Sequence, residues 1–157
     1  MPIDANALGD RGEKMLDLAL TSLHNGVPLF RPCSLGAKWP VCDFVVELWD
    51  SPGRVFLLQA KATSRPLGSR LHRVPIDISS ALVGKLVSAP IPAYLAAIHE
   101  PTNRAYLAVP SQAKRITSLT SANCLNDAAT RVALLNEVNQ FWDGIAPFAP
   151  ANSQFKD

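Results

Sequence analysis

The spacing of apolar residues predicts an amphipathic helix near the start of the chain. Between residues 9 and 23, apolar side chains recur at steps of three and four positions, which places them on one face of a helix. The pair Asn25-Gly26 follows, and we expect it to end the helix. Glu13 falls in the first turn, where the helix dipole favours a carboxylate in any case. Its position alone therefore has an ordinary structural explanation.

Two apolar runs predict a pair of strands in the next part of the chain. Residues 41–49 and 55–62 are rich in β-branched and aromatic side chains, and Pro and Gly between them indicate a turn. Strands with so short a connection pair antiparallel. Because side chains alternate between the two faces of a strand, Gln59 and Lys61 point to the same face. The pairing brings Asp43 close to both.

The rest of the pattern completes an α/β fold. We predict a short helix at residues 79–87, strands at 93–99 and 104–109 that form a hairpin, and a final helix at 128–142. The polar segment 111–126 is assigned to no element. Helices that alternate with pairs of strands indicate an α/β sandwich with a central mixed sheet flanked by helices.

The composition is typical of a globular domain. Of the 157 residues, 48% are hydrophobic and 18% are charged. We expect residues 1–150 to form a single domain and residues 151–157 to form a disordered tail. No apolar run is long enough to span a bilayer, and the first residues lack the apolar core of a signal peptide. We therefore expect a cytoplasmic protein without a membrane partner.

The cysteines and histidines lack the spacing of a metal or nucleophile site. Cys33, Cys42 and Cys124 are odd in number and form no CxxC pair, which favours buried, reduced thiols over a disulfide framework or a zinc site. The three histidines show no ligand spacing either. The sequence also contains no phosphate loop of the GxxxxGK type, which argues against ATP use.

One segment concentrates basic side chains, although the net charge of the chain is only +2. Between residues 54 and 73 there is no acidic residue. The basic residues of this segment are Arg54, Lys61, Arg65, Arg70, His72 and Arg73. Two interpretations are open: a rim that attracts phosphates, or an ordinary solvated loop.

Polar residues interrupt both predicted strands of the first pair. The strand at residues 55–62 is apolar enough to be covered on both faces, where the unpaired ammonium of Lys61 would be costly. Asp43, also among apolar residues, is its natural partner. One interpretation is a buried ion pair, but such a pair alone contributes little stability. Polar groups that converge on one strand pair therefore favour a functional site.

The residue types at this position suit a hard divalent cation. The carboxylates of Glu13 and Asp43, the side-chain carbonyl of Gln59 and the main-chain carbonyl of Ala60 are oxygen ligands of the kind that bind Mg²⁺ or Mn²⁺. Such a cation activates water and neutralises charge on a phosphate, while Lys61 orients the water or stabilises the transition-state anion. The set predicts hydrolysis of a phosphodiester bond.

Three segments resemble, in this order, the motifs of the PD-(D/E)XK nuclease superfamily: Gly9-Asp10-Arg11-Gly12-Glu13, Pro40-Val41-Cys42-Asp43 and Gln59-Ala60-Lys61-Ala62-Thr63. The branch that they resemble contains Mrr-type restriction enzymes and archaeal Holliday-junction resolvases. Residues 90–95 and 105–107 are similar to the later strands of small prokaryotic proteins of this kind that are linked to mobile elements and phage defence. The resemblance covers residues 9–110.

The resemblance implies a restriction-endonuclease-like fold and a DNA endonuclease that depends on Mg²⁺ or Mn²⁺ and acts in phage defence or DNA processing. Within it, Glu13 matches the acid of the first helix and Asp43 the principal metal ligand. Gln59 matches the second ligand and Lys61 the catalytic lysine.

DNA and a second protein subunit are the partners that we expect. Contacts to the DNA backbone are predicted for Thr63, Ser64, Arg65, Arg70 and Arg73. A small nuclease that cuts duplex DNA commonly needs two sites, which predicts a homodimer or a subunit of a larger complex. The hairpin at residues 90–109 and the last helix are the expected contact surfaces.

Gln59 departs from the family pattern, because most members carry a carboxylate at this position. With one negative charge fewer, cation binding depends more on Glu13 and on substrate phosphates. The alternative prediction is therefore a catalytically degenerate nuclease fold that binds nucleic acid or a partner protein within a defence complex.

Overall fold

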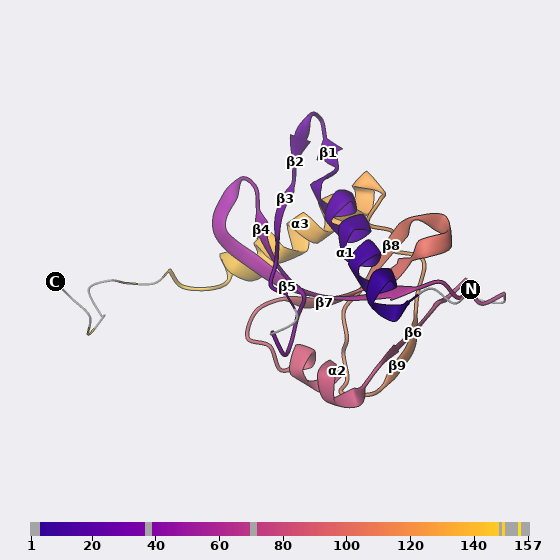
Figure 1. The fold of residues 1–157 in the computed structure, drawn as a ribbon. Coiled ribbons are helices and arrows are strands. Elements are labelled where there is room, and N and C mark those ends of the chain that lie inside the picture. The colour runs from indigo at the N-terminus through magenta and orange to yellow at the C-terminus, as the bar shows by residue number, and fades with distance from the viewer. Residues whose placement is uncertain (1–3, 37–38, 70–71, 148, 150–153, 155–157) are drawn as a thin grey trace.

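The computed structural model describes residues 4–36, 39–69, 72–147, 149 and 154. Figure 1 shows how its helices and strands are arranged. In chain order they are α1 (Ala5–Thr21), β1 (Leu23–His24), β2 (Val27–Pro28), β3 (Phe30–Ser34), β4 (Phe44–Leu48), β5 (Ser51–Thr63), β6 (Val74–Ile78), α2 (Ser80–Val87), β7 (Ala93–His99), the 3₁₀ helix η1 (Glu100–Thr102), β8 (Arg104–Ala108), β9 (Ile116–Leu119) and α3 (Ala128–Asp143).

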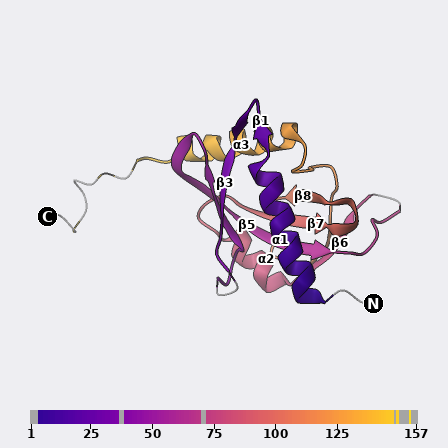
Figure 2. The ribbon, with the colours of Figure 1, turned by 45° about the horizontal axis from the view of Figure 1, so that its top comes forward.

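A five-stranded mixed sheet with the strand order β3-β4-β5-β7-β8 forms the middle layer. The pair β5-β7 is parallel, and the other neighbours are antiparallel. One face packs against α1 and α3, and the other packs against α2 and the small sheet of β6 and β9, as Figures 1 and 2 show. The predicted central mixed sheet flanked by helices is therefore confirmed.

Helix α1 begins earlier and ends earlier than its apolar spacing predicts. The side chain of Asp4 accepts a hydrogen bond from the backbone N–H of Asn6 (3.2 Å) and so caps the helix. Asn25 and Gly26 do not end the helix, because they form the turn between β1 and β2, with φ angles of 52° and 79°. Asn-Gly suits this turn since both residues tolerate a left-handed backbone.

The predicted hairpin of β4 and β5 is confirmed, with Phe44 opposite Leu58 and Val46 opposite Phe56. Strand β4 is shorter than expected, and Asp43 lies immediately before it rather than inside it. Strand β5 is longer than expected, because it runs from Ser51 to Thr63. The hairpin of β7 and β8, helix α2 and helix α3 also agree with the predicted elements to within a residue or two.

Three strands that pair over long sequence distances are absent from the predicted pattern. Strand β3 contains Pro32 and lies at the edge of the central sheet, where a missing N–H is tolerated. Strand β6 lies between the predicted strand at residues 55–62 and the predicted helix at residues 79–87, where no element is predicted, and β9 lies inside the unassigned polar segment. These two strands pair only with each other, and a long stretch of chain separates them, so the neighbouring sequence predicts neither strand.

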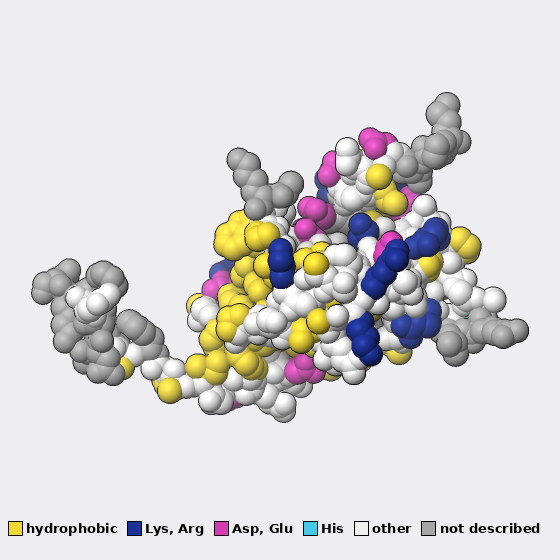
Figure 3. Space-filling view, turned by 90° about the horizontal axis from the view of Figure 1, so that it is seen from below, with side chains coloured by type: hydrophobic (Ala, Val, Ile, Leu, Met, Phe, Trp, Pro, Cys, Tyr) yellow, Lys and Arg dark blue, Asp and Glu magenta, His cyan; other side chains and the backbone are white. Residues whose placement is uncertain are grey.

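The side of the molecule formed by α2, β6 and β9 carries an uneven distribution of side chains. In Figure 3, which looks onto this side, Lys and Arg side chains gather in one part and hydrophobic side chains in another.

No helix in the described part of the chain is long and apolar enough to cross a membrane. Most of the expected tail, residues 151–157, lies outside the described residues.

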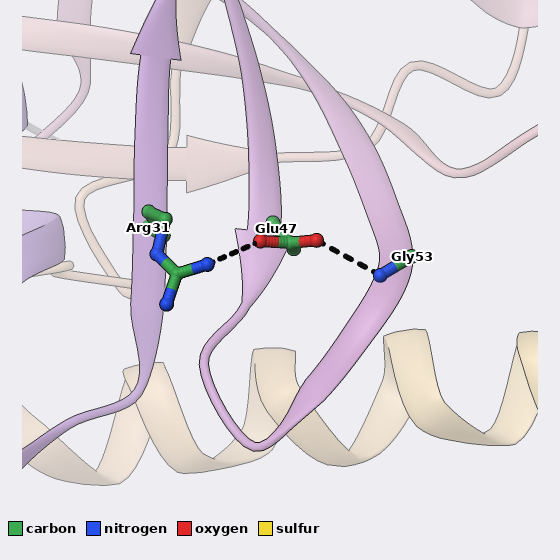
Figure 4. A network of polar contacts seen from close by, with 3 residues as sticks. All are labelled: Arg31, Glu47 and Gly53. Atoms are coloured by element: carbon green, nitrogen blue, oxygen red, sulfur yellow. Dashed lines mark hydrogen bonds and ion pairs between the residues drawn. The ribbon is translucent and has the colours of Figure 1, made fainter.

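A closed polar network ties β3, β4 and β5 together at the end of the sheet where β4 turns into β5 (Figure 4). Glu47 accepts hydrogen bonds from Arg31 Nη1 and from the backbone N–H of Gly53, both at 2.8 Å. The guanidinium of Arg31 also lies 4.6 Å from the centre of the Trp49 ring. We call these four residues the turn network.

The cysteines agree with the prediction in two of three cases. Cys42 and Cys124 are buried, whereas Cys33 is exposed on edge strand β3, and none of the three forms a disulfide. The expectation of a buried thiol is therefore wrong for Cys33, because its position on β3 points away from the core.

Candidate active site

A hollow of about 600 Å³ lies between α1, β5 and the start of α2. Its lining includes all the residues predicted to form the site, namely Glu13, Asp43, Gln59, Ala60 and Lys61. They come from three separate parts of the chain, which the packing of α1 against the first hairpin brings together. We call this hollow the acidic pocket.

A glycine allows α1 to approach β5 closely enough to form the acidic pocket. A Cβ atom on Gly12 would lie 2.6 Å from the Cβ of Ala62, a distance that side chains do not adopt. The helix therefore contacts the strand directly at this point, and the next residue, Glu13, reaches the pocket. The sequence motif contains Gly12, but only the contact with Ala62 explains its presence.

The backbone and the side chain of Asp43 are both held by neighbouring strands. Its N–H donates to Leu58 O (3.0 Å), and its carbonyl accepts from the N–H of Leu35 (2.8 Å). Its Oδ2 atom accepts hydrogen bonds from the backbone N–H of Ala60 (2.7 Å) and from Gln59 Nε2 (2.5 Å). The carboxylate is thus fixed at the wall of the pocket before any ligand arrives.

The amide group of Gln59 bridges two oxygen atoms that were predicted to bind a cation. Its Nε2 atom donates to Asp43 Oδ2 and also to the carbonyl of Ala60, the latter at 3.2 Å. A carboxylate accepts hydrogen bonds and donates none when it is ionised, so the amide must turn its NH₂ group toward Asp43. The side chain therefore stands between these two oxygens as a neutral donor.

Lys61 is exposed, which corrects the expectation that its ammonium is buried. Lys61 lines the acidic pocket, so no other element packs over this position of β5, although Thr63 at the end of the strand is buried. Among the described residues, Lys61 makes no ion pair within 4.0 Å. Its charge still acts on the pocket, because it opposes the rise in the pKa of Asp43 that burial causes.

Burial and like charges destabilise the ionised carboxylates of the pocket. Burial raises the pKa of Asp43 above its usual range, and the hydrogen bond from Ala60 and the charge of Lys61 oppose this only in part. Burial is also the largest cause of the raised pKa of Glu13, and the negative charges of Asp43 and Asp10 raise it further. A cation in the pocket would relieve both effects.

The donor set fits a hard cation in the type of its ligands, but it contains few charged groups. The carboxylates of Glu13 and Asp43 and the carbonyl of Ala60 supply oxygen ligands to one cavity, which suits Mg²⁺ or Mn²⁺. Within the described ranges, however, no three His, Cys, Asp or Glu residues are grouped to hold a metal ion. Gln59 adds an oxygen only if its amide turns over, so the predicted ligand set provides the two negative charges of Glu13 and Asp43.

Two further polar residues, Asp77 and Ser79, line the pocket, and the sequence indicated neither as a site residue. Ser79 caps α2 by accepting a hydrogen bond from the N–H of Leu82 (3.3 Å). Asp77 belongs to β6 and accepts two hydrogen bonds from Arg115, which lies just before β9. Ser79 was visible as the start of a helix, whereas the position of Asp77 depends on the pairing of β6 with β9.

The residues predicted to contact DNA do not all face outward. Ser64, Arg65 and Arg73 are exposed, and Arg73 donates hydrogen bonds to Ser118 on β9 (2.8 and 2.9 Å). Thr63 is only 5% exposed, and its hydroxyl accepts a hydrogen bond from the N–H of Arg65 (3.2 Å). The contact of Thr63 with DNA stays a prediction, which its burial makes less favourable than contacts of the exposed residues. Arg70 lies outside the described residues.

No protein-family model matches this sequence, and no curated protein matches it either.

Proposed function

We propose that this protein is a nuclease of the PD-(D/E)XK type that hydrolyses DNA phosphodiester bonds with the help of Mg²⁺ or Mn²⁺. The observation that carries the proposal is the convergence of Glu13, Asp43, Gln59 and Lys61 on one cavity. Two carboxylates with raised pKa values and an ammonium at the same cavity suit the binding of a cation together with a phosphate. The restriction-endonuclease-like fold and a role in phage defence or DNA processing are parts of the same proposal.

The residues of the pocket have distinct roles in this proposal. Asp43, Glu13 and the carbonyl of Ala60 would hold the cation, which, when bound, supplies Lewis-acid activation of water and of the phosphate. The hydrogen bond from the N–H of Ala60 keeps Asp43 in place at 2.7 Å. Lys61, exposed at the mouth, is free to orient the attacking water or to stabilise charge that develops on the phosphate.

Gln59 favours a second candidate function, a nuclease fold that binds DNA or a partner protein without cutting. Its amide nitrogen contacts the same two oxygens, Asp43 Oδ2 and Ala60 O, that a cation would need. A cation must displace this amide, so binding costs more than in a pocket with a second carboxylate. The two candidates differ in whether the protein binds a divalent cation with useful affinity.

Cleavage of plasmid and linear DNA with Mg²⁺ or Mn²⁺ tests the first candidate. We expect Asp43→Asn, which keeps a hydrogen-bond acceptor, and Lys61→Gln each to reduce cleavage by about 100-fold or more, since both remove charge that acts on the transition state. Glu47→Gln, in the turn network, is the matched control and should cut at nearly the wild-type rate. Undiminished cleavage by both pocket variants would refute the assignment.

Calorimetric titration with Mn²⁺, with and without DNA, separates the two candidates. The nuclease proposal expects binding that strengthens when DNA is present, because substrate phosphates complete the ligand set. Complete lack of Mn²⁺ binding under both conditions, together with retained DNA binding, would support the module that does not cut. A homodimer remains a prediction of the nuclease candidate, and light scattering measures it.

A further inference from the structure

A second hollow, of about 430 Å³, opens beside the acidic pocket. It is lined by Asp77, Ser79, Ser80 and Arg115. Asp77 and Ser79 line both hollows, so the two are direct neighbours on either side of these residues. A ligand longer than the acidic pocket would extend into this second hollow.

Arg115 holds Asp77 in a geometry that also fits a phosphate. Nε and Nη2 of Arg115 each donate to one carboxylate oxygen of Asp77, and both distances are 2.8 Å. The planar guanidinium binds carboxylates and phosphates in this same two-bonded manner. The side chains are 65% and 55% exposed for Arg115 and Asp77. Because exposed ion pairs contribute little free energy, another anion can replace the carboxylate at low cost.

Several positive charges act on the carboxylate of Asp77. The hydrogen bond from Arg115 is the largest cause that lowers the pKa of Asp77, and the charges of Arg115, Arg65 and Lys61 lower it further. The charges of Lys61 on β5, Arg65 just after it and Arg115 just before β9 therefore act on one exposed acidic group. Figure 3 shows the gathering of Lys and Arg side chains on this side of the molecule.

We propose that Arg115, together with Lys61 and Arg65, binds a backbone phosphate of DNA next to the acidic pocket, and that Asp77 occupies this phosphate subsite until DNA displaces it. The subsite rests on the proposed function only in taking DNA as the ligand. Asp77 acts as an internal competitor, since it neutralises Arg115 in the free protein and repels an incoming phosphate. DNA overcomes this competition because it makes further contacts in the adjacent pocket.

Fluorescence anisotropy with a labelled DNA duplex tests the subsite without any cleavage. The measurements use the full chain in EDTA at several salt concentrations. We expect Asp77→Asn to tighten binding about 3- to 10-fold at low salt, because it removes the competing charge. We expect Arg115→Gln to weaken binding about 5-fold and to reduce the slope of log Kd against log salt by about one phosphate contact. In the Arg115→Gln background, Asp77→Asn should have a smaller effect.

The turn network provides controls, because Arg31 and Glu47 form another Arg–carboxylate ion pair, on β3 and β4 and outside both hollows. Arg31→Gln and Glu47→Gln should change DNA affinity less than twofold. Circular dichroism melts verify that all variants are folded. A variant of Asp77 that fails to tighten binding, a variant of Arg115 that binds like the Arg31 control, or a wild-type protein that binds no duplex would each overturn the subsite.

The outcome for the subsite is independent of the outcome for the nuclease. If the binding pattern appears and no DNA is cut with Mg²⁺ or Mn²⁺, the subsite stands and the nuclease proposal fails. If DNA is cut while the variants of Asp77 and Arg115 behave like the turn-network controls, the subsite is wrong and the nuclease proposal stands.

Discussion

The two ends of the β4–β5 hairpin carry similar residues in opposite states. At the turn, the carboxylate of Glu47 is paired with Arg31 and with the N–H of Gly53, and the network is closed (Figure 4). At the other end, Asp43 receives hydrogen bonds from an amide and a backbone N–H, and burial raises its pKa. No guanidinium pairs with Asp43 among the described residues.

This difference separates a stabilising contact from a candidate site. A carboxylate that is paired with a cation at the surface contributes modestly to the free energy of unfolding and needs no ligand. A partly buried carboxylate beside a second carboxylate is costly for the fold, and such a cost is maintained where function requires it. The hairpin thus contains a structural end and, under the proposed function, a functional end within one pair of strands.

Gly12→Ala should have the largest effect, because it separates α1 from the functional end. The added methyl group would meet Ala62 at 2.6 Å, so the helix must move. We expect a loss of about 1–3 kcal/mol in the free energy of unfolding and, since Glu13 is displaced, a loss of about 100-fold in DNA cleavage. Gly9→Ala is the matched control, because a Cβ atom there meets no atom within 4 Å. Equal behaviour of the two variants in urea unfolding and in cleavage would show that close helix contact is not required.

Gln59→Glu should increase the affinity of the acidic pocket for a divalent cation. The new carboxylate replaces the amide that contacts Asp43 and supplies the charge that the pocket lacks. We expect Mn²⁺ to bind about 10-fold more tightly, equivalent to about 1.4 kcal/mol, as measured by calorimetry. Gln140→Glu, an exposed change of the same charge on α3, should leave the affinity unchanged. An equal gain in both variants would indicate a general effect of net charge.

Glu47→Ala tests whether the turn network stabilises the fold. It removes the acceptor for Arg31 and for the N–H of Gly53, so we expect the free energy of unfolding to fall by about 1 kcal/mol. Arg31→Ala should cost a similar amount, and the double variant should cost less than the sum. Urea denaturation measures all three. Strictly additive losses would mean that the two residues act separately.

Asp43→Asn should raise the free energy of unfolding, whereas Glu47→Ala lowers it, and this effect should be the smallest of those described. The pKa of Asp43 is raised in the folded protein, so its ionised form is penalised by folding, and the neutral amide avoids this penalty. At neutral pH we expect the variant to be more stable by about 0.5 kcal/mol, a value that allows for remaining solvent contact. The advantage should shrink as the pH falls through the raised pKa and vanish below the ordinary value of 3.8. Thermal melts between about pH 3 and about pH 8 measure this difference, and an Asp43→Asn variant that is less stable throughout would contradict the expectation.

Local patterns determined much of this protein from sequence alone. Alternation along β5 places Gln59 and Lys61 at one pocket, and the short connection to β4 brings Asp43 beside them. Helices α2 and α3 and the β7–β8 hairpin also follow from local spacing. These features depend on neighbours within a few residues, so the sequence carries their signal directly.

Only the tertiary structure decided which of these groups are buried and what else joins them. Lys61 is exposed because it lines the acidic pocket instead of packing against another element, and Asp77 meets Arg115 because β6 pairs with β9 across a long stretch of chain. The contact between Gly12 and Ala62 likewise joins a helix to a strand that is distant in sequence. Burial and such pairings depend on the whole packed arrangement, and no local pattern of side chains encodes them.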